Sequence, residues 1–156
     1  MKTIVHAGLA LVILASAGPA IAQEAPITTR SGTLGEPAAG KGQVVFFRPS
    51  SIVGGALGCT VREGAGAAET EVARLGSGKY YIVQATPGAH RYFTKGEVTD
   101  RLDMEIEEGG TYFATCKIGV GIVAGRGNLS PSDRATFAKK AKGLTMWKGP
   151  KAEKID

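Results

Sequence analysis

Residues 79–107 read KYYIVQATPGAHRYFTKGEVTDRLDMEIE, and this stretch decides the fold class. Its last part alternates Leu102, Met104 and Ile106 with charged side chains. A period of two is typical of a strand with one buried face. Two earlier apolar runs flank the sequence TPGA at residues 86–89. Proline at the second position and glycine at the third favour a tight turn there, so the stretch predicts three consecutive strands.

Short apolar runs and glycine turns continue on both sides of this stretch. Residues 44–48 (VVFFR) form a continuous apolar run, as expected for a strand covered on both faces. The patterns predict seven strands, at residues 44–48, 59–62, 71–75, 79–86, 90–95, 101–107 and 111–118. Gly76 and Gly78 favour a hairpin between the third and the fourth. Together these strands predict an all-β fold, a small antiparallel β-sandwich.

The composition divides the chain into four parts. Residues 1–22 contain one lysine, an apolar run and small residues before Gln23, which is the pattern of a signal peptide removed on export. We expect residues 23–42 to be a flexible leader, residues 43–127 to form the β-sandwich domain, and residues 128–156 to form a C-terminal helix and basic tail. The protein is therefore predicted to be periplasmic or secreted, with no transmembrane segment once the signal is removed.

One short basic helix is predicted in the C-terminal part. Ser130 with Pro131 and Asp133 forms a capping pattern, and Gly143 provides a stop. The sequence SDRATFAKKAK between them has a thin apolar stripe, so we expect the helix to pack weakly or fray. Residues 134–156 hold seven Lys or Arg against two acids. This excess of positive charge indicates docking on anionic lipid or an envelope polymer.

Two cysteines, Cys59 and Cys116, fall on the apolar sides of predicted strands. The expected compartment permits a disulfide between them, and two separate buried thiols are the alternative. Metal or redox chemistry is poorly supported, because His90 is the only histidine after residue 22 and no CxxC occurs. No cofactor is predicted.

No assembled catalytic set stands out in the sequence. Residues 35–42 (GEPAAGKG) have the spacing of a phosphate loop but lack the Ser or Thr that follows its lysine. The glycines of residues 119–127 miss the dinucleotide-binding spacing by one position. His90 beside a turn is expected to be a hydrogen-bonded structural residue. We therefore predict that the protein is not an enzyme.

Eight of the ten aromatic residues form adjacent pairs, at residues 46–47, 80–81, 92–93 and 112–113. Neighbours on a strand point to opposite faces, so each pair sends one ring inward and one outward. Aligned outer rings would form a stripe that binds sugar, lipid or protein. The alternative is a second small core beneath the terminal helix and the segment that begins at Gly119.

Six segments, read in order, resemble a bacterial envelope family known as domain of unknown function 2846. They are VVFFRPSS, LGCTVRE, ARLGSGKYYIV, TPGAHRYF, EEGGTYFATCKIG and VGIVAGRG. The resemblance spans residues 43–127 and implies a small β-sandwich in exported proteins, with no established activity or catalytic residues. Some relatives look lipid-anchored, whereas this chain lacks the lipid-attachment cysteine.

These observations predict an exported, non-catalytic β-sandwich module that binds an envelope protein, lipid or polymer, and no nucleic acid. The alternative is a small-ligand carrier or an enzyme with a polar site. Such a site would use residues that flank predicted strand ends, namely Arg48, Ser50, Ser51 and Arg126. This alternative requires the four side chains to converge on one pocket.

Overall fold

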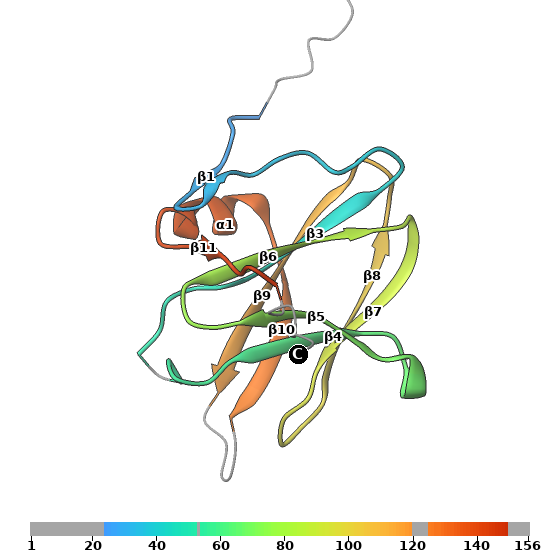
Figure 1. Cartoon of the computed structure of the whole chain (residues 1–156), viewed down its shortest axis with the longest axis vertical. Coiled ribbons are helices and arrows are strands. Elements are labelled where there is room, and N and C mark those ends of the chain that lie inside the picture. The colour runs from blue at the N-terminus through green and yellow to red at the C-terminus, as the bar shows by residue number, and fades with distance from the viewer. Residues whose placement is uncertain (1–23, 53, 120–124, 150–156) are drawn as a thin grey trace, which may run out of the picture.

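A computed structural model describes residues 24–52, 54–119 and 125–149 (Figure 1). Most of these residues are in strands, and the described part contains one α-helix. The elements are β1 (Thr28–Thr29), β2 (Gly32–Thr33), β3 (Gly42–Arg48), β4 (Cys59–Glu63), a 3-10 turn (Gly66–Ala68), β5 (Thr70–Leu75), β6 (Lys79–Ala85), β7 (Gly88–Thr94), β8 (Asp100–Ile106), β9 (Thr111–Gly119), β10 (Arg126–Ser132), α1 (Arg134–Ala141) and β11 (Thr145–Met146).

Two sheets pack face to face. One has five strands in the order β10-β9-β3-β6-β11, and the other has four in the order β5-β4-β7-β8. All seven predicted strands are present, and the predicted all-β sandwich is confirmed. The sandwich is not wholly antiparallel, because β3 pairs with β9, and β11 with β6, in parallel. A period-two pattern reveals which face of a strand is buried but not the direction of its neighbour.

The predicted hairpin at Gly76 and Gly78 is wrong. The connection carries the chain from β5 in the four-stranded sheet to β6 in the five-stranded sheet. Strand β6 pairs instead with β3, where Phe46 lies opposite Tyr81. A short glycine linker between two apolar runs fits a change of sheet as well as a hairpin, because both need only a tight reversal of the chain.

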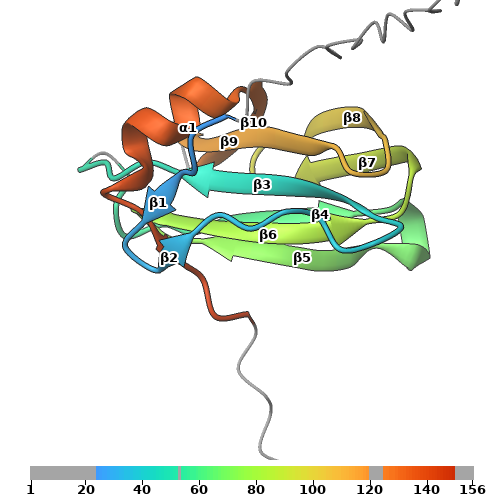
Figure 2. The same ribbon diagram turned by 90° about the horizontal axis from the view of Figure 1, so that it is seen from above.

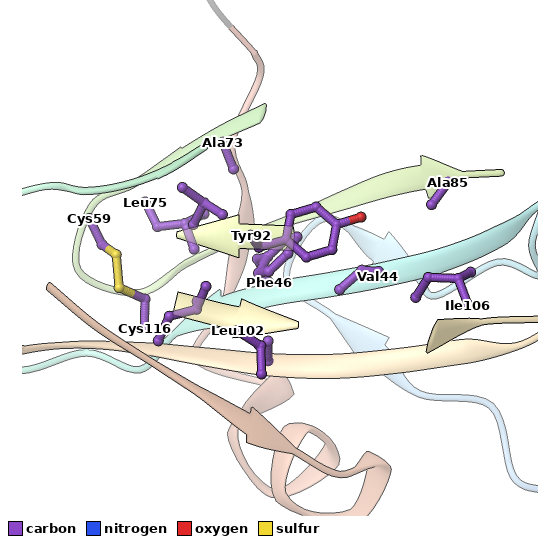
Figure 3. Close-up of a cluster of buried hydrophobic side chains, with 13 residues drawn as sticks. Val44, Phe46, Cys59, Ala73, Leu75, Ala85, Tyr92, Leu102, Ile106 and Cys116 are labelled. Carbon is purple, nitrogen blue, oxygen red and sulfur yellow. A yellow bond between two sulfur atoms is a disulfide. The ribbon is translucent and has the colours of Figure 1, made fainter. Parts of the chain in front are cut away.

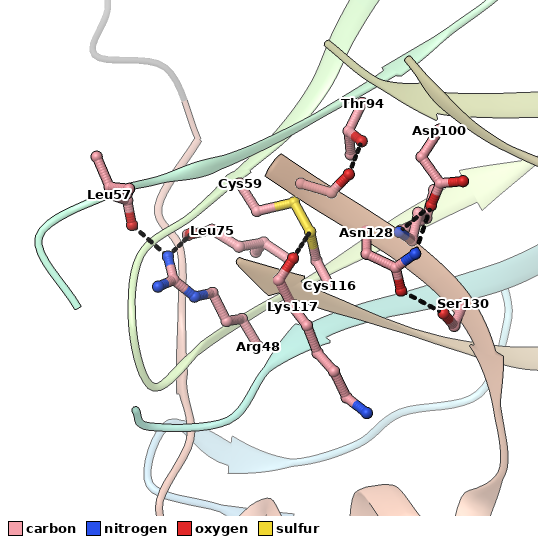
Figure 4. Close-up of a disulfide and its surroundings, with 12 residues drawn as sticks. Arg48, Leu57, Cys59, Leu75, Thr94, Asp100, Cys116, Lys117, Asn128 and Ser130 are labelled. Carbon is pink, nitrogen blue, oxygen red and sulfur yellow. Dashed lines mark hydrogen bonds between the residues drawn. A yellow bond between two sulfur atoms is a disulfide. The ribbon is translucent and has the colours of Figure 1, made fainter. Parts of the chain in front are cut away.

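The main core lies between the two sheets (Figure 3). Strand β3 is buried along its whole length, as its apolar run predicts. Its Phe46 ring meets the Tyr92 ring of the opposite sheet edge-on, with ring centroids 4.9 Å apart. A disulfide joins Cys59 of β4 to Cys116 of β9, and their Cα atoms are 6.4 Å apart. The disulfide alternative is therefore confirmed, and the bridge links the two sheets covalently (Figure 4).

A second core lies on the other face of the five-stranded sheet, beneath α1. The Phe137 ring of the helix is fully buried among Phe47, Tyr80 and Phe113, with centroids 5.2, 5.7 and 5.3 Å away. The aromatic rings on this face therefore form a small core, and the expectation that the helix packs weakly is wrong. The other predicted cover, residues 120–124 of the segment that begins at Gly119, lies outside the described residues.

Part of the predicted leader is packed against the body. Strands β1 and β2 form a short hairpin beside α1 (Figure 2), and Ile27 is buried in the second core. The Thr29 hydroxyl lies 3.0 Å from the hydroxyl of Tyr80, and Arg134 donates a hydrogen bond to the Ala25 carbonyl. The boundary expected between a flexible leader and the domain, at residues 42–43, is therefore too late in the sequence. Two apolar residues, Ile27 and Leu34, and contacts distant in sequence hold this segment, and neither produces a periodic pattern.

The start of the helix differs from its prediction. Ser130 and Pro131 belong to β10, which pairs with β9 along its length, so the sheet extends beyond residue 127. Proline is tolerated there because β10 is an edge strand. The N-cap is Asp133, whose carboxylate accepts a hydrogen bond of 2.7 Å from the Thr136 amide. This bond helps to hold the pKa of Asp133 below its ordinary value.

The predicted signal peptide, residues 1–22, lies outside the described residues, and so do residues 150–156. Among the helical segments that are described, none has the length and apolar character that crossing a bilayer requires.

Candidate functional site

Arg48, the first residue of the predicted polar site, is a structural residue. Its side chain is buried at the end of β3, where Nη1 donates to the carbonyls of Leu57 and Leu75 (Figure 4). Nη2 donates to the carbonyl of Gly54. Burial lowers the pKa of this guanidinium from its ordinary value. Arg48 therefore binds Gly54 and Leu57, which precede β4, to the end of β3 rather than facing a ligand.

The other three residues of that predicted site have contacts that differ from those of the Arg48 guanidinium. Arg126 donates a hydrogen bond of 3.1 Å to Glu97, in the turn between β7 and β8. The Ser51 amide donates to the Ser77 hydroxyl at 2.9 Å. Ser50 is exposed and lines a surface hollow below the end of α1. Among the described pockets, none is lined by more than one of the four predicted residues.

His90 is a hydrogen-bonded structural residue, as predicted. Its Nδ1 pairs with a Glu63 carboxylate oxygen, and its Nε2 lies 2.7 Å from the Thr86 carbonyl. The ring stacks on that of Tyr92. Burial disfavours the imidazolium, but the hydrogen bonds to Glu63 and Thr86, with the nearby Glu63 and Glu105 charges, outweigh burial and raise the pKa of His90 above its ordinary value.

Stability should therefore fall as the pH rises through the raised pKa of His90. The folded state binds this proton more tightly than the unfolded state, so the stabilisation is complete below the unfolded value of about 6.5 and is lost above the folded value. Urea unfolding between pH 5.5 and 9 should show this loss, and His90→Gln should remove it. Chemical-shift titration of His90 gives the pKa directly, and a value below 6.5 would contradict the assignment.

Exposed apolar side chains gather at one end of the sandwich. Strands β3 and β9 end there and β6 begins there, and we call this the loop end. Ile52, Leu57 and Val98 lie in its connections, and they are three of the four large apolar side chains exposed among the described residues. Ile52 is completely exposed, at 101%. The side chain of Leu57 packs beside Gly125, which also lies against the β7–β8 turn.

Basic side chains of α1 reach the same end. The helix begins near the opposite end, after β10, and its last turn carries Lys139 and Lys140 back toward Pro49. These two lysines line a hollow of about 310 Å³ together with Pro49, Ser50, Gly143 and Leu144. Lys139, Lys140 and Lys142 are exposed, and within the described part of the chain none of them forms an ion pair. We call these three lysines the cationic helix end.

The opposite end of the sandwich carries acidic side chains. Glu107 and Glu108 follow β8, and the amide of Gly109 donates to the Lys41 carbonyl just before β3 begins. A hollow at this end is lined in part by Glu36 and Asp133. Glu107 and Glu108 therefore lie, together with Lys41 and Arg134, at the end of the sandwich opposite the cationic helix end.

The sequence indicates that basic residues are concentrated after residue 133, but it does not show that they lie beside the apolar loops. Sequence reasoning placed these lysines in a helix expected to pack weakly or fray, whereas the buried Phe137 fixes that helix on the sandwich, with the lysines beside the loop end. It also passed over Ile52 and Leu57. The signal that could have found them is the sequence SIVGGALG at residues 51–58, where apolar residues stand in a glycine-rich connection instead of a strand.

A scan against protein-family models found no match for the chain, and searches of the curated proteins and of the solved structures found none either. The resemblance to domain of unknown function 2846 therefore stays a prediction.

Proposed function

We propose that this protein is an exported, non-catalytic module that binds an anionic component of the cell envelope through the cationic helix end. The observation that carries the proposal is the set of exposed lysines, Lys139, Lys140 and Lys142, without ion-pair partners in the described part of the chain. Adjacent ammonium groups produce a positive potential, which phosphate or carboxylate groups of a partner would offset.

Two further features support the proposal. The signal-peptide pattern of residues 1–22 supports export, and the disulfide between Cys59 and Cys116 suits an oxidising compartment. The acidic side chains at the opposite end would orient the protein, because an anionic surface attracts one end and repels the other.

Replacing Lys139, Lys140 and Lys142 by glutamine should weaken binding to an anionic surface about 100-fold. A lysine near such a surface contributes about 1 kcal/mol, and each 1.4 kcal/mol is tenfold in affinity. The probes are vesicles rich in phosphatidylglycerol and soluble polyphosphate, measured at low and physiological salt. Substitution is preferable to deletion of residues 134–156, because the deletion would also remove the buried Phe137.

Lys41→Gln is the matched control, since Lys41 lies at the acidic end of the sandwich. This control should bind like the original protein, and unchanged thermal unfolding would show that the triple variant is folded. Equal binding by the triple variant and the original protein would contradict the proposal, as would failure of the original protein to bind either probe.

A further inference from the structure

Hydrogen bonds tie the backbone of the loop end on both sides of its exposed apolar residues. The Gly55 amide donates to the Ile52 carbonyl at 3.2 Å, and the Leu57 amide donates to the Gly54 carbonyl at 3.0 Å. Arg48 binds the carbonyls of Gly54 and Leu57 from below. These bonds anchor Ile52 and residues 54–57 to the sandwich, and anchoring of this kind reduces the conformational entropy lost when a loop binds.

The segment that leads to the exposed isoleucine contacts the cationic helix end. Pro49 and Ser50, which lead into Ile52, line the hollow that contains Lys139 and Lys140. Positive and apolar groups therefore lie at the same end of the sandwich, and amphipathic helices combine such groups to bind the interface of an anionic bilayer. Here the combination comes from a loop and the end of a helix.

A soluble polyanion and a membrane would use this surface differently. A polyanion would contact the lysines and would gain nothing from Ile52. A bilayer offers phosphate groups to the lysines and, a few ångströms deeper, an apolar layer to the isoleucine. Two further exposed apolar side chains at the same end, Leu57 and Val98, favour the bilayer.

We infer that the anionic component is the lipid bilayer itself, and that the loop end docks on it with Ile52 inserted among the acyl chains. This inference rests on the proposed function, since it assigns a partner to the same surface. The acidic Glu107 and Glu108 at the far end would then face away from the membrane.

The test compares binding of Ile52→Ser with that of the original protein on two probes, vesicles rich in phosphatidylglycerol and soluble polyphosphate. Ile52→Ser should reduce vesicle binding about tenfold, as expected for the partial burial of one isoleucine, and should leave polyphosphate binding unchanged. Ile52→Leu is the matched control and should retain vesicle binding, because it preserves the apolar volume. The fully exposed side chain makes no packing contact whose loss could unfold the protein.

The outcomes separate the two proposals. If Ile52→Ser binds vesicles like the original protein while the lysine variant does not, the inference of insertion is wrong and the proposed function stands. Binding to polyphosphate without binding to vesicles also overturns the inference and points to a soluble polymer. If the lysine variant keeps its affinity for both probes, the proposed function itself is wrong.

Discussion

Replacing Phe137 by alanine is expected to lower the free energy of unfolding by about 4 kcal/mol. The Phe137 ring is fully buried and contacts three aromatic rings of the five-stranded sheet, those of Phe47, Tyr80 and Phe113. A buried Phe→Ala change costs about 3 to 5 kcal/mol, because the surrounding side chains fill the cavity only partly. Urea unfolding followed by circular dichroism measures the change.

Ala138→Ser is the control for this variant, because Ala138 is the next residue of α1 and is exposed. The control should change the free energy of unfolding by less than about 0.5 kcal/mol. A loss below about 1 kcal/mol for Phe137→Ala would show that the helix frays, as the thin apolar stripe of its sequence suggests, and would contradict the second core.

Removing the disulfide with Cys59→Ala and Cys116→Ala should cost about 4 kcal/mol. The bridge closes a loop with a sequence separation of 57 and joins the two sheets. In the chain-entropy model, opening a loop of this length gives the unfolded chain enough freedom to account for that loss. A stability of 5 to 15 kcal/mol is typical of a domain, so the bridge would account for a large fraction of it.

The measurement is urea unfolding with and without a reducing agent. Reductant should destabilise the original protein to about the level of the double variant and should leave that variant unchanged. Equal stability of the original protein in oxidising and reducing buffer would contradict the assigned role of the bridge.

The sandwich could be predicted from sequence because most of its strands have a recognisable pattern of apolar residues within the strand itself. Leu102 and Ile106 of β8 are buried while Asp103 and Glu105 between them are exposed, so one period-two pattern fixes both faces. The continuous run of β3 likewise reports a strand covered on both sides. In each case, information within seven residues decides the burial.

Other elements depend on contacts that no local pattern records. Strand β10 contains Asn128 and Pro131, which favour turns in isolation, and it forms a strand because β9 supplies its hydrogen bonds. The hairpin of β1 and β2 is held by Tyr80 and by the helix. Their structure is decided by partners far away in the chain.

The positive charge of the candidate site could be predicted from the sequence, but the positions of its side chains could not. Arg48 looked like a ligand-binding residue because arginine is polar and stands at a strand end. In the structure its guanidinium instead donates hydrogen bonds to three backbone carbonyls. Conversely, Ile52 is one apolar residue among many in the sequence, and only its full exposure at the same end as Lys139 and Lys140 gives it a role in the proposals above.

The contacts between the two terminal segments have a consequence for the order of folding. The Arg30 amide donates to the Leu144 carbonyl at 3.0 Å, and the Met146 amide donates to the Ser31 hydroxyl at 2.8 Å. A chain is synthesised from its N-terminus, so residues 24–34 appear long before their partners exist. We therefore expect the main sandwich to form first, and the segment that precedes it to dock last, once residue 146 has joined the edge of β6.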